Sequence, residues 1–172
     1  MTHVYRTTAT YAADDASTNW KERAARYSLL PLRLFLGVTF IYAGLDKLFD
    51  SAFLSASGTG SIGALMENVR NGSAVPALVD VALKRPEGFG YAMAFGELAV
   101  GIGTLLGLLA RLAALGGALI SLSLWLTVSW QTEPYYYGND LAYLMAWLPL
   151  VLAGASVFSL DAAIAERRRR SR

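Results

Sequence analysis

Residues 89–130 read FGYAMAFGELAVGIGTLLGLLARLAALGGALISLSLWLTVSW, an apolar stretch whose only charged residues are Glu97 and Arg111. A transmembrane helix needs about 20 apolar residues to cross roughly 30 Å of hydrocarbon, so about 40 residues are too many for one span. Backbone inside a bilayer must satisfy its own hydrogen bonds, which favours helices. We therefore predict two spans, 89–110 and 112–130, that are joined by a tight turn near Arg111.

Two further apolar runs of similar length flank this stretch. They cover residues 29–48 and residues 141–160. With 55% hydrophobic residues in 172 positions, the chain is too apolar for a soluble domain of its size. The predicted fold is therefore an all-α integral membrane four-helix bundle. Its transmembrane domain covers 28–165, between a polar tail of residues 1–27 and a short basic tail of residues 166–172.

The basic residues indicate how the bundle is oriented. Short segments that stay in the cytoplasm carry an excess of Lys and Arg. With the amino terminus inside, the outer side holds only Lys47, Arg70, Lys84 and Arg85, whereas the inner side holds Arg6, Lys21, Arg23, Arg26, Arg33, Arg111, Arg167, Arg168, Arg169, Arg170 and Arg172. We predict a multi-pass protein of the cell membrane, specifically a bacterial plasma membrane, with both termini in the cytoplasm. The run Arg167–Arg170 then serves as an anchor to lipid headgroups.

The outer loop between the first two spans, about 50–86, has a helical periodicity of its own. Apolar residues recur at helical spacing in 62–70 and again in 76–84, and the turn-prone sequence Asn71-Gly72-Ser73 separates the two segments. We predict two short amphipathic helices in this loop. They either lie on the membrane surface as a connector or form a lid over the bundle.

Small residues predict where helices approach one another closely. Gly103 and Gly107 form a small-xxx-small pair, and Ala113 with Gly117 repeats this spacing on the next span. Small side chains at this spacing let two helix backbones come together. We therefore expect close backbone contact between the second and third spans.

The residue types that the chain lacks limit its chemistry. Cysteine is absent, which excludes disulfides, thiolate metal sites and cysteine nucleophiles. The single histidine, His3, lies in the polar tail, so the spans offer no imidazole as a haem ligand. No metal, haem or flavin site is evident. The basic residues cluster at membrane boundaries, where orientation and lipid headgroups explain them at least as well as nucleic acid does, and we expect no nucleic-acid partner.

Glu97 is the strongest candidate for a functional side chain. The helical rise puts it about 13 Å below the outer surface, close to the middle of the bilayer. A carboxyl group at that depth is energetically costly and by default indicates a site. Thr39 and Ser121 come out at similar depth, and Arg33 is a candidate cation if its side chain extends outward. A carboxyl that only ties helices together is the alternative interpretation.

The order and spacing of several short motifs resemble the DoxX/DoxD family of four-helix membrane proteins. The motifs are the run RLFLGVTFIYAGLDKL at 33–48, Phe95-Gly96-Glu97-Leu98, Gly101, Gly107, Arg111, Tyr136-Tyr137-Gly138-Asn139-Asp140 and Ser159-Leu160-Asp161. The resemblance implies a bundle of four helices. For some members it also implies a role as the membrane subunit of thiosulfate:quinone oxidoreductase, and for others a place in oxidative-stress complexes.

Two functions follow from this resemblance together with the residues. In the first, the chain is the membrane subunit of a quinone-linked redox system, with quinone as substrate and electrons supplied by an outside reductant or a soluble or membrane partner subunit. Glu97 is then catalytic, and the quinone-binding candidates are Arg33, Tyr42, Lys47, Tyr137 and Asp140. In the second, the chain is a non-catalytic scaffold in the lipid bilayer that recruits redox or oxidative-stress enzymes. A small-solute transporter ranks third, and a homo-oligomer is left open.

The charge asymmetry predicts that residue 171 faces the cytoplasm while residues 71 and 136 face outside. Because the chain has no cysteine, the variants Asn71→Cys, Tyr136→Cys and Ser171→Cys each present a single thiol. A membrane-impermeant thiol reagent added to intact cells should label the first two variants and leave the third unlabelled. Labelling of Ser171→Cys from outside would overturn the four-span topology.

Overall fold

The computed structural model describes residues 20–155 and 157–170, which are mostly helical and contain no strand. Residues 1–19 of the predicted polar tail and residues 171–172 of the predicted basic tail lie outside the described residues. Helical residues 20–27 come before the first labelled helix. The elements are α2 (Leu30–Phe49), α3 (Ile62–Arg70), α4 (Pro76–Leu83), α5 (Pro86–Leu106), α6 (Ala110–Thr127), the 3-10 turn η1 (Tyr135–Tyr137), α7 (Asn139–Ala153) and α8 (Leu160–Arg170).

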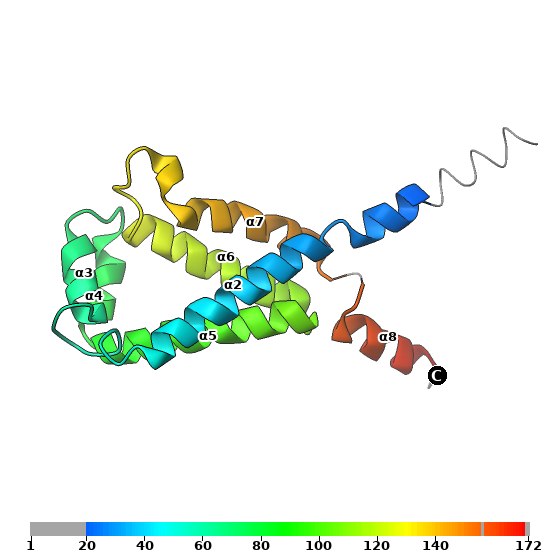
Figure 1. The fold of residues 1–172 in the computed structure, drawn as a ribbon, viewed down its shortest axis with the longest axis horizontal. Helices are drawn as coiled ribbons and strands as arrows, with labels where there is room; N and C mark the ends of the chain where they lie inside the picture. Colours follow the sequence, from blue (N-terminus) through cyan, green and yellow to red (C-terminus); the bar gives the residue numbers. More distant parts are fainter. Residues whose placement is uncertain (1–19, 156, 171–172) are drawn as a thin grey trace, which may run out of the picture.

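The long helices form an elongated bundle (Figure 1). Three of them are long and apolar enough to cross a membrane, namely the helix that ends at Phe49, α5 and α6, whereas α7 is apolar but shorter. These findings confirm the prediction of an all-α membrane protein. Helix α2 packs along α5 and helix α6 packs along α7, while α2 and α7 touch each other much less.

The two predicted loop helices are confirmed as α3 and α4, and they stand across one end of the bundle, which we call the cap end (Figure 1). Two hydrogen bonds attach the segment between them to α6: Ser73 Oγ and the Ala74 N–H both donate to the Leu126 carbonyl, at 3.1 and 2.8 Å. The apolar core of the cap consists of Ile62, Met66, Val79 and Ala82. The helices therefore form a packed cap over the bundle.

An ion pair on the surface links the two cap helices. Arg70 Nε donates to Asp80 Oδ1 at 2.5 Å, and this hydrogen bond lowers the pKa of the Asp80 carboxyl. Both side chains are exposed to solvent. Because an exposed pair contributes little to stability, the cap depends mainly on its buried apolar residues.

The core in the middle of the bundle surrounds Trp147 of α7, whose side chain is fully buried. The Phe40 ring packs edge-on against the indole with 4.9 Å between ring centroids. A Cβ atom at Gly117 would lie 2.3 Å from the indole, so this glycine makes room for the tryptophan. Gly117 therefore faces α7, whereas the sequence led us to expect it against the second span.

The closest backbone contact between two of the described helices lies between α2 and α5. A Cβ atom at Gly44 would lie 2.7 Å from the Ala94 carbonyl oxygen, and one at Gly101 would lie 2.7 Å from the Ile41 nitrogen. From the sequence we expected the close contact between the second and third spans. There Gly103 does meet Ala113, but Gly107 has a left-handed backbone conformation (φ +63°) that ends α5. A small-residue pattern indicates close packing without specifying the partner helix.

The opposite end of the bundle, which we call the tail end, carries the α5–α6 turn and α8 (Figure 1). The turn occupies residues 107–109, as predicted from Arg111.

The fourth predicted span, 141–160, is too long, because α7 ends at Ala153. Pro149 lies inside α7 and removes a helical hydrogen bond. Gly154 then takes φ +71° and ψ −155°, which ends the helix. The predicted basic tail of residues 166–172 is not a separate segment at its start, because α8 extends to Arg170.

The contact between α2 and α5 predicts a contrast between two glycines. Gly44→Ala should lower the melting temperature in detergent, because its Cβ collides with backbone, at a cost of about 1–3 kcal/mol. Gly96→Ala is the matched control, since a Cβ there would only make ordinary contact, 3.7 Å from Ile120 Cδ1. Equal melting temperatures for the two variants would disprove the close packing at Gly44.

Candidate functional site

A buried ion pair joins α2 to α5 in the half of the bundle nearer the cap. Lys47 Nζ donates to both carboxylate oxygens of Glu97, at 3.0 and 2.8 Å. Glu97 is only 3% exposed, and the Lys47 side chain is 23% exposed. Counting from the start of α5 at Pro86, Glu97 lies about 16 Å along the helix, near its midpoint. Glu97 is therefore a buried carboxylate near the middle of α5 that is paired with a lysine of α2.

The antiparallel packing of α2 and α5 explains why these two side chains meet. Gly37 of α2 packs near Leu105 of α5, and Gly44 packs near Ala94, so the two helices run in opposite directions. Each Cα–Cβ bond in a helix tilts toward the amino-terminal end of its own helix. Lys47 therefore leans toward the tail end and Glu97 toward the cap end. Their side chains converge from positions about one helical turn apart.

Asp140, at the start of α7, adds a third charge to this region. It lies within electrostatic range of both Lys47 and Glu97. Ser129 Oγ, just beyond the end of α6, donates a hydrogen bond to the Asp140 carboxylate. We define the charged cluster as Lys47, Glu97 and Asp140, which come from α2, α5 and α7. Lys47 also lies 5.9 Å from the centre of the Phe53 ring, in the segment leading to the cap.

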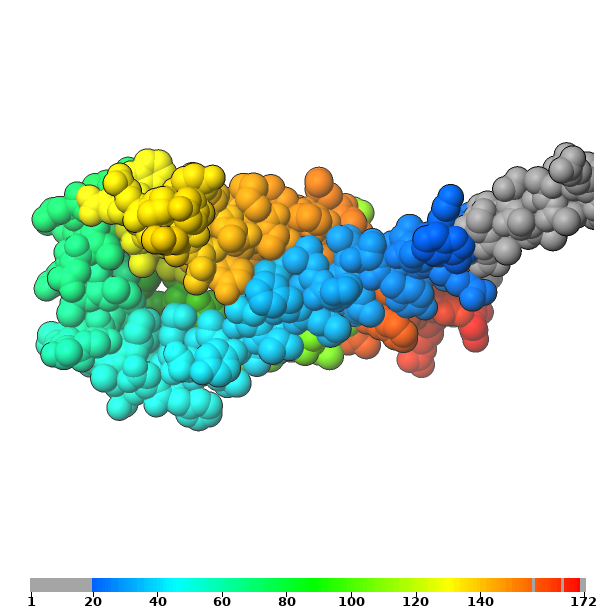
Figure 2. Space-filling view, turned by 45° about the horizontal axis from the view of Figure 1, so that its top comes forward, coloured from blue at the N-terminus to red at the C-terminus, as the bar shows by residue number. Residues whose placement is uncertain are grey.

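The protein surface is hollowed where these elements separate. Figure 2 shows an opening between the cyan end of α2 and the yellow to orange segment that leads into α7. Lys47 lies near the end of α2 and Asp140 near the start of α7, so both belong to elements that border the opening. The weak contact between α2 and α7 leaves room for it.

An apolar cavity of about 150 Å³ lies between the cap and the helices α5 and α6. Its α5 wall includes Phe89 and Met93, which are spaced by four residues and continue to Glu97 at the next such step. Residues four apart lie on the same face of a helix. The cavity therefore lies on the same side of α5 as the charged cluster. The other lining residues are Met66, Leu78, Val79, Val81, Ser123, Leu124 and Thr127.

The structure brings together three of the six predicted site residues and separates the other three. Glu97, Lys47 and Asp140 form the charged cluster, whereas Tyr42 is 71% exposed and Tyr137 is 69% exposed in η1. Among the described residues, no hydrogen bond joins either tyrosine to the cluster.

The expectation that Arg33 supplies the cation for Glu97 is wrong. Arg33 lies at the tail end, where its guanidinium donates to the carbonyls of Val157 and Phe158 at 2.7 and 2.8 Å. Lys47 takes the place that Arg33 was expected to fill, because its long side chain reaches inward from the end of α2. Sequence reasoning also missed Ser129, since nothing in its local pattern indicates a contact with α7.

A family model described as DoxX matches residues 28–130, which include Lys47 and Glu97 but not Asp140. No curated protein and no solved structure matches the chain.

The ion pair predicts strong coupling between Lys47 and Glu97 in stability. Lys47→Met leaves a carboxylate buried without its cation, so the free energy of unfolding should fall by about 2 kcal/mol. The double variant Lys47→Met/Glu97→Gln should recover at least half of this loss, because no charge is then left unpaired. Denaturation of the wild type, both single variants and the double variant in detergent measures the coupling. Strictly additive effects would argue against a stabilising pair.

Proposed function

Because the chain belongs to the DoxX family, we propose that it is the quinone-binding membrane subunit of a redox system, with Lys47 and Glu97 at the site of the quinone head. The observation that carries this proposal is the buried Lys47–Glu97 ion pair beside Asp140. An ion pair that is buried in apolar surroundings contributes little net stability compared with apolar packing. A functional role gives a reason for a buried carboxylate near the middle of α5.

The chemistry of a quinone suits this cluster. A quinone carries two carbonyl oxygens on an apolar ring, and the ammonium group of Lys47 can donate a hydrogen bond to one of them. Reduction to quinol takes up two electrons and two protons. Lys47 and Glu97 can exchange protons with the developing oxyanions at the site. Asp140 accepts a hydrogen bond from Ser129 and lies toward the cap-end surface. Its carboxylate can carry protons from that surface to Lys47 and Glu97 and so replace those that the quinone takes up.

The apolar cavity supports the same proposal. A membrane quinone is mostly apolar, and the cavity wall at Phe89 and Met93 continues along α5 to Glu97. Leu78 and Val81, which also line the cavity, are 45% and 61% exposed. A quinone dissolved in the bilayer can therefore approach across an apolar surface without passing through water.

Electrons in this proposal come from outside the chain. In the thiosulfate reaction that the family resemblance suggests, two thiosulfate anions join to form tetrathionate and release two electrons. These electrons and two protons convert one quinone to quinol. The chain has no cysteine to serve as a thiol relay. The reductant therefore reacts near the cluster, or a partner subunit delivers the electrons.

The proposal predicts that Glu97→Gln weakens quinone binding. Binding of a short-tail ubiquinone analogue to the purified protein can be followed by quenching of tryptophan fluorescence. The carboxylate of Glu97 holds the Lys47 ammonium in place. Without it the flexible lysine side chain is no longer fixed at the site, so its hydrogen bond to the quinone is lost and the affinity should fall about tenfold. Thiosulfate-dependent quinone reduction in membranes should fall with it. Asp46→Asn is the matched control, because it removes an exposed carboxylate next to Lys47 and should leave binding unchanged.

Failure of the quinone-binding assay would favour the scaffold function instead. If the wild-type protein contains no quinone after purification and binds none of the analogue, the quinone proposal fails. Normal analogue binding by a folded Glu97→Gln variant would remove Glu97 from the site.

A further inference from the structure

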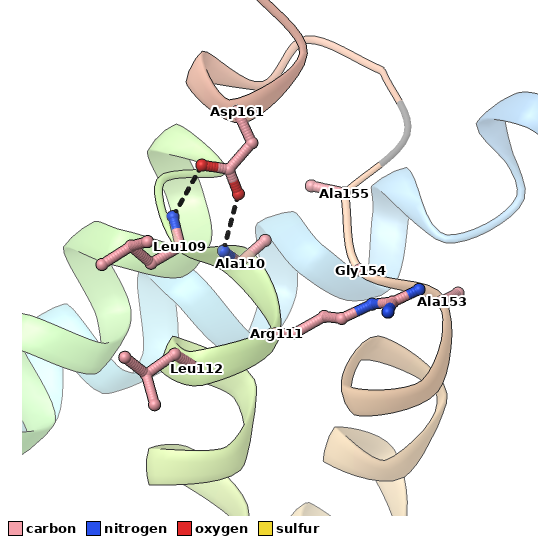
Figure 3. Close-up of a pocket in the computed structure, with 8 residues that line it drawn as sticks. All are labelled: Leu109, Ala110, Arg111, Leu112, Ala153, Gly154, Ala155 and Asp161. Carbon is pink, nitrogen blue, oxygen red and sulfur yellow. Dashed lines mark hydrogen bonds between the residues drawn. The ribbon is translucent and has the colours of Figure 1, made fainter. Parts of the chain in front are cut away.

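A cavity of about 370 Å³ opens at the tail end of the bundle. Figure 3 shows the residues that line it. It lies between the start of α6, the segment that follows α7 and the start of α8. Its volume falls in the range of small-molecule sites. The lining residues are Leu109, Ala110, Arg111, Leu112, Ala153, Gly154, Ala155 and Asp161.

Arg111 is the cation of this cavity, and the backbone around it is built to receive its side chain. The side chain crosses Gly154, where a Cβ atom would lie 3.2 Å from Arg111 Cγ and 3.3 Å from its Nε. Gly154 has φ +71° and ψ −155°, a backbone conformation that is essentially limited to glycine. Figure 3 shows the guanidinium beside Ala153 and Gly154. No described residue accepts a hydrogen bond or forms an ion pair with Arg111.

Asp161 is the one carboxylate that lines the cavity, and it is already engaged elsewhere. Its two oxygens accept hydrogen bonds from the backbone N–H groups of Leu109 and Ala110, each at 2.9 Å (Figure 3). This contact caps the amino terminus of α6, whose helix dipole stabilises a negative charge there. The carboxylate of Asp161 is therefore bound to the start of α6. It forms no ion pair with Arg111 among the described residues.

A second guanidinium flanks the same segment. Arg33 is 5% exposed and donates to the carbonyls of Val157 and Phe158, three to four residues beyond Gly154. Its buried Nε has no hydrogen-bond partner among the described residues. Two cations thus lie at this end of the bundle, Arg111 beside Gly154 and Arg33 beside Val157 and Phe158, and this part of the tail end should attract an anion.

Exposed apolar side chains stand next to the cavity. Leu109 and Leu112, both lining residues, are 61% and 63% exposed. Helix α6 is one of the helices suited to cross a membrane, so its first turn lies where the acyl chains meet the headgroups. A ligand at this position would need an anionic group for Arg111 and an apolar part for the leucines.

We propose that this cavity binds the phosphate group of an anionic phospholipid. The guanidinium of Arg111 matches the geometry of a phosphate and can donate two parallel hydrogen bonds to it. The acyl chains lie along Leu109 and Leu112. Basic pockets between membrane helices are a known way of holding anionic headgroups. This inference concerns the tail end alone and does not depend on the quinone proposal.

Native mass spectrometry of the full chain in detergent tests the proposal with phosphatidylglycerol and phosphatidylcholine as probes. We expect the wild type to retain phosphatidylglycerol preferentially. Arg111→Gln should weaken that binding about tenfold and leave phosphatidylcholine unaffected, because one charge-assisted phosphate contact is lost. Arg111→Lys should give an intermediate loss. Arg85→Gln is the matched control, since it removes an exposed arginine at the cap end and should leave this binding unchanged.

Two results would overturn the proposal. One is equal retention of phosphatidylglycerol by the wild type and by Arg111→Gln, provided that both have the same melting temperature. The other is displacement of the lipid by millimolar inorganic phosphate, which would identify a free-anion site without a role for the acyl chains.

Discussion

The close approach of α2 and α5 at Gly44 and Gly101 is the constraint on which the arrangement of the bundle depends. With no side chain at either position, the two backbones come into contact and run antiparallel. That geometry makes Lys47 and Glu97 lean toward each other, and the surrounding side chains then bury the pair. A wider spacing between the helices would let water reach the carboxylate and weaken the electrostatic attraction.

The two ends of the bundle use charged residues in different ways. At the cap end, the charges lie within or beside the bundle, where Lys47, Glu97 and Asp140 come from three different helices. At the tail end, Arg33 and Asp161 bind backbone groups and hold the segment after α7 against the rest of the protein. Side chains that hold backbone are part of the architecture. In the charged cluster the ammonium of Lys47 also reaches a backbone group, the Ala43 carbonyl of its own helix at 3.4 Å, but its shorter contacts are with the Glu97 carboxylate. This difference is why we propose a functional role for the cap-end cluster.

The cap also shapes the environment of the cluster. Helices α3 and α4 close the end of the bundle with their own apolar core and are tied to α6 at Leu126. Beneath them, the space between α5 and α6 stays partly open as an apolar cavity. Helices α2 and α7 diverge beneath the cap, so the cluster lies between an apolar cavity and an opening on the surface. An apolar molecule with a polar head fits such surroundings.

The sequence by itself determined the helical class, the turn near Arg111 and the two cap helices, because these follow from local hydrophobic periodicity, turn-forming residues and the length of a membrane span. It also singled out Glu97, since a carboxyl in an apolar run is conspicuous. Only the tertiary structure decided that Lys47, and not Arg33, is its partner, and that α7 ends at Ala153. Depth along a helix says nothing about the direction in which a side chain leans or which neighbour it faces. Those contacts arise when α2 packs against α5 and when Arg33 binds the carbonyls beyond α7.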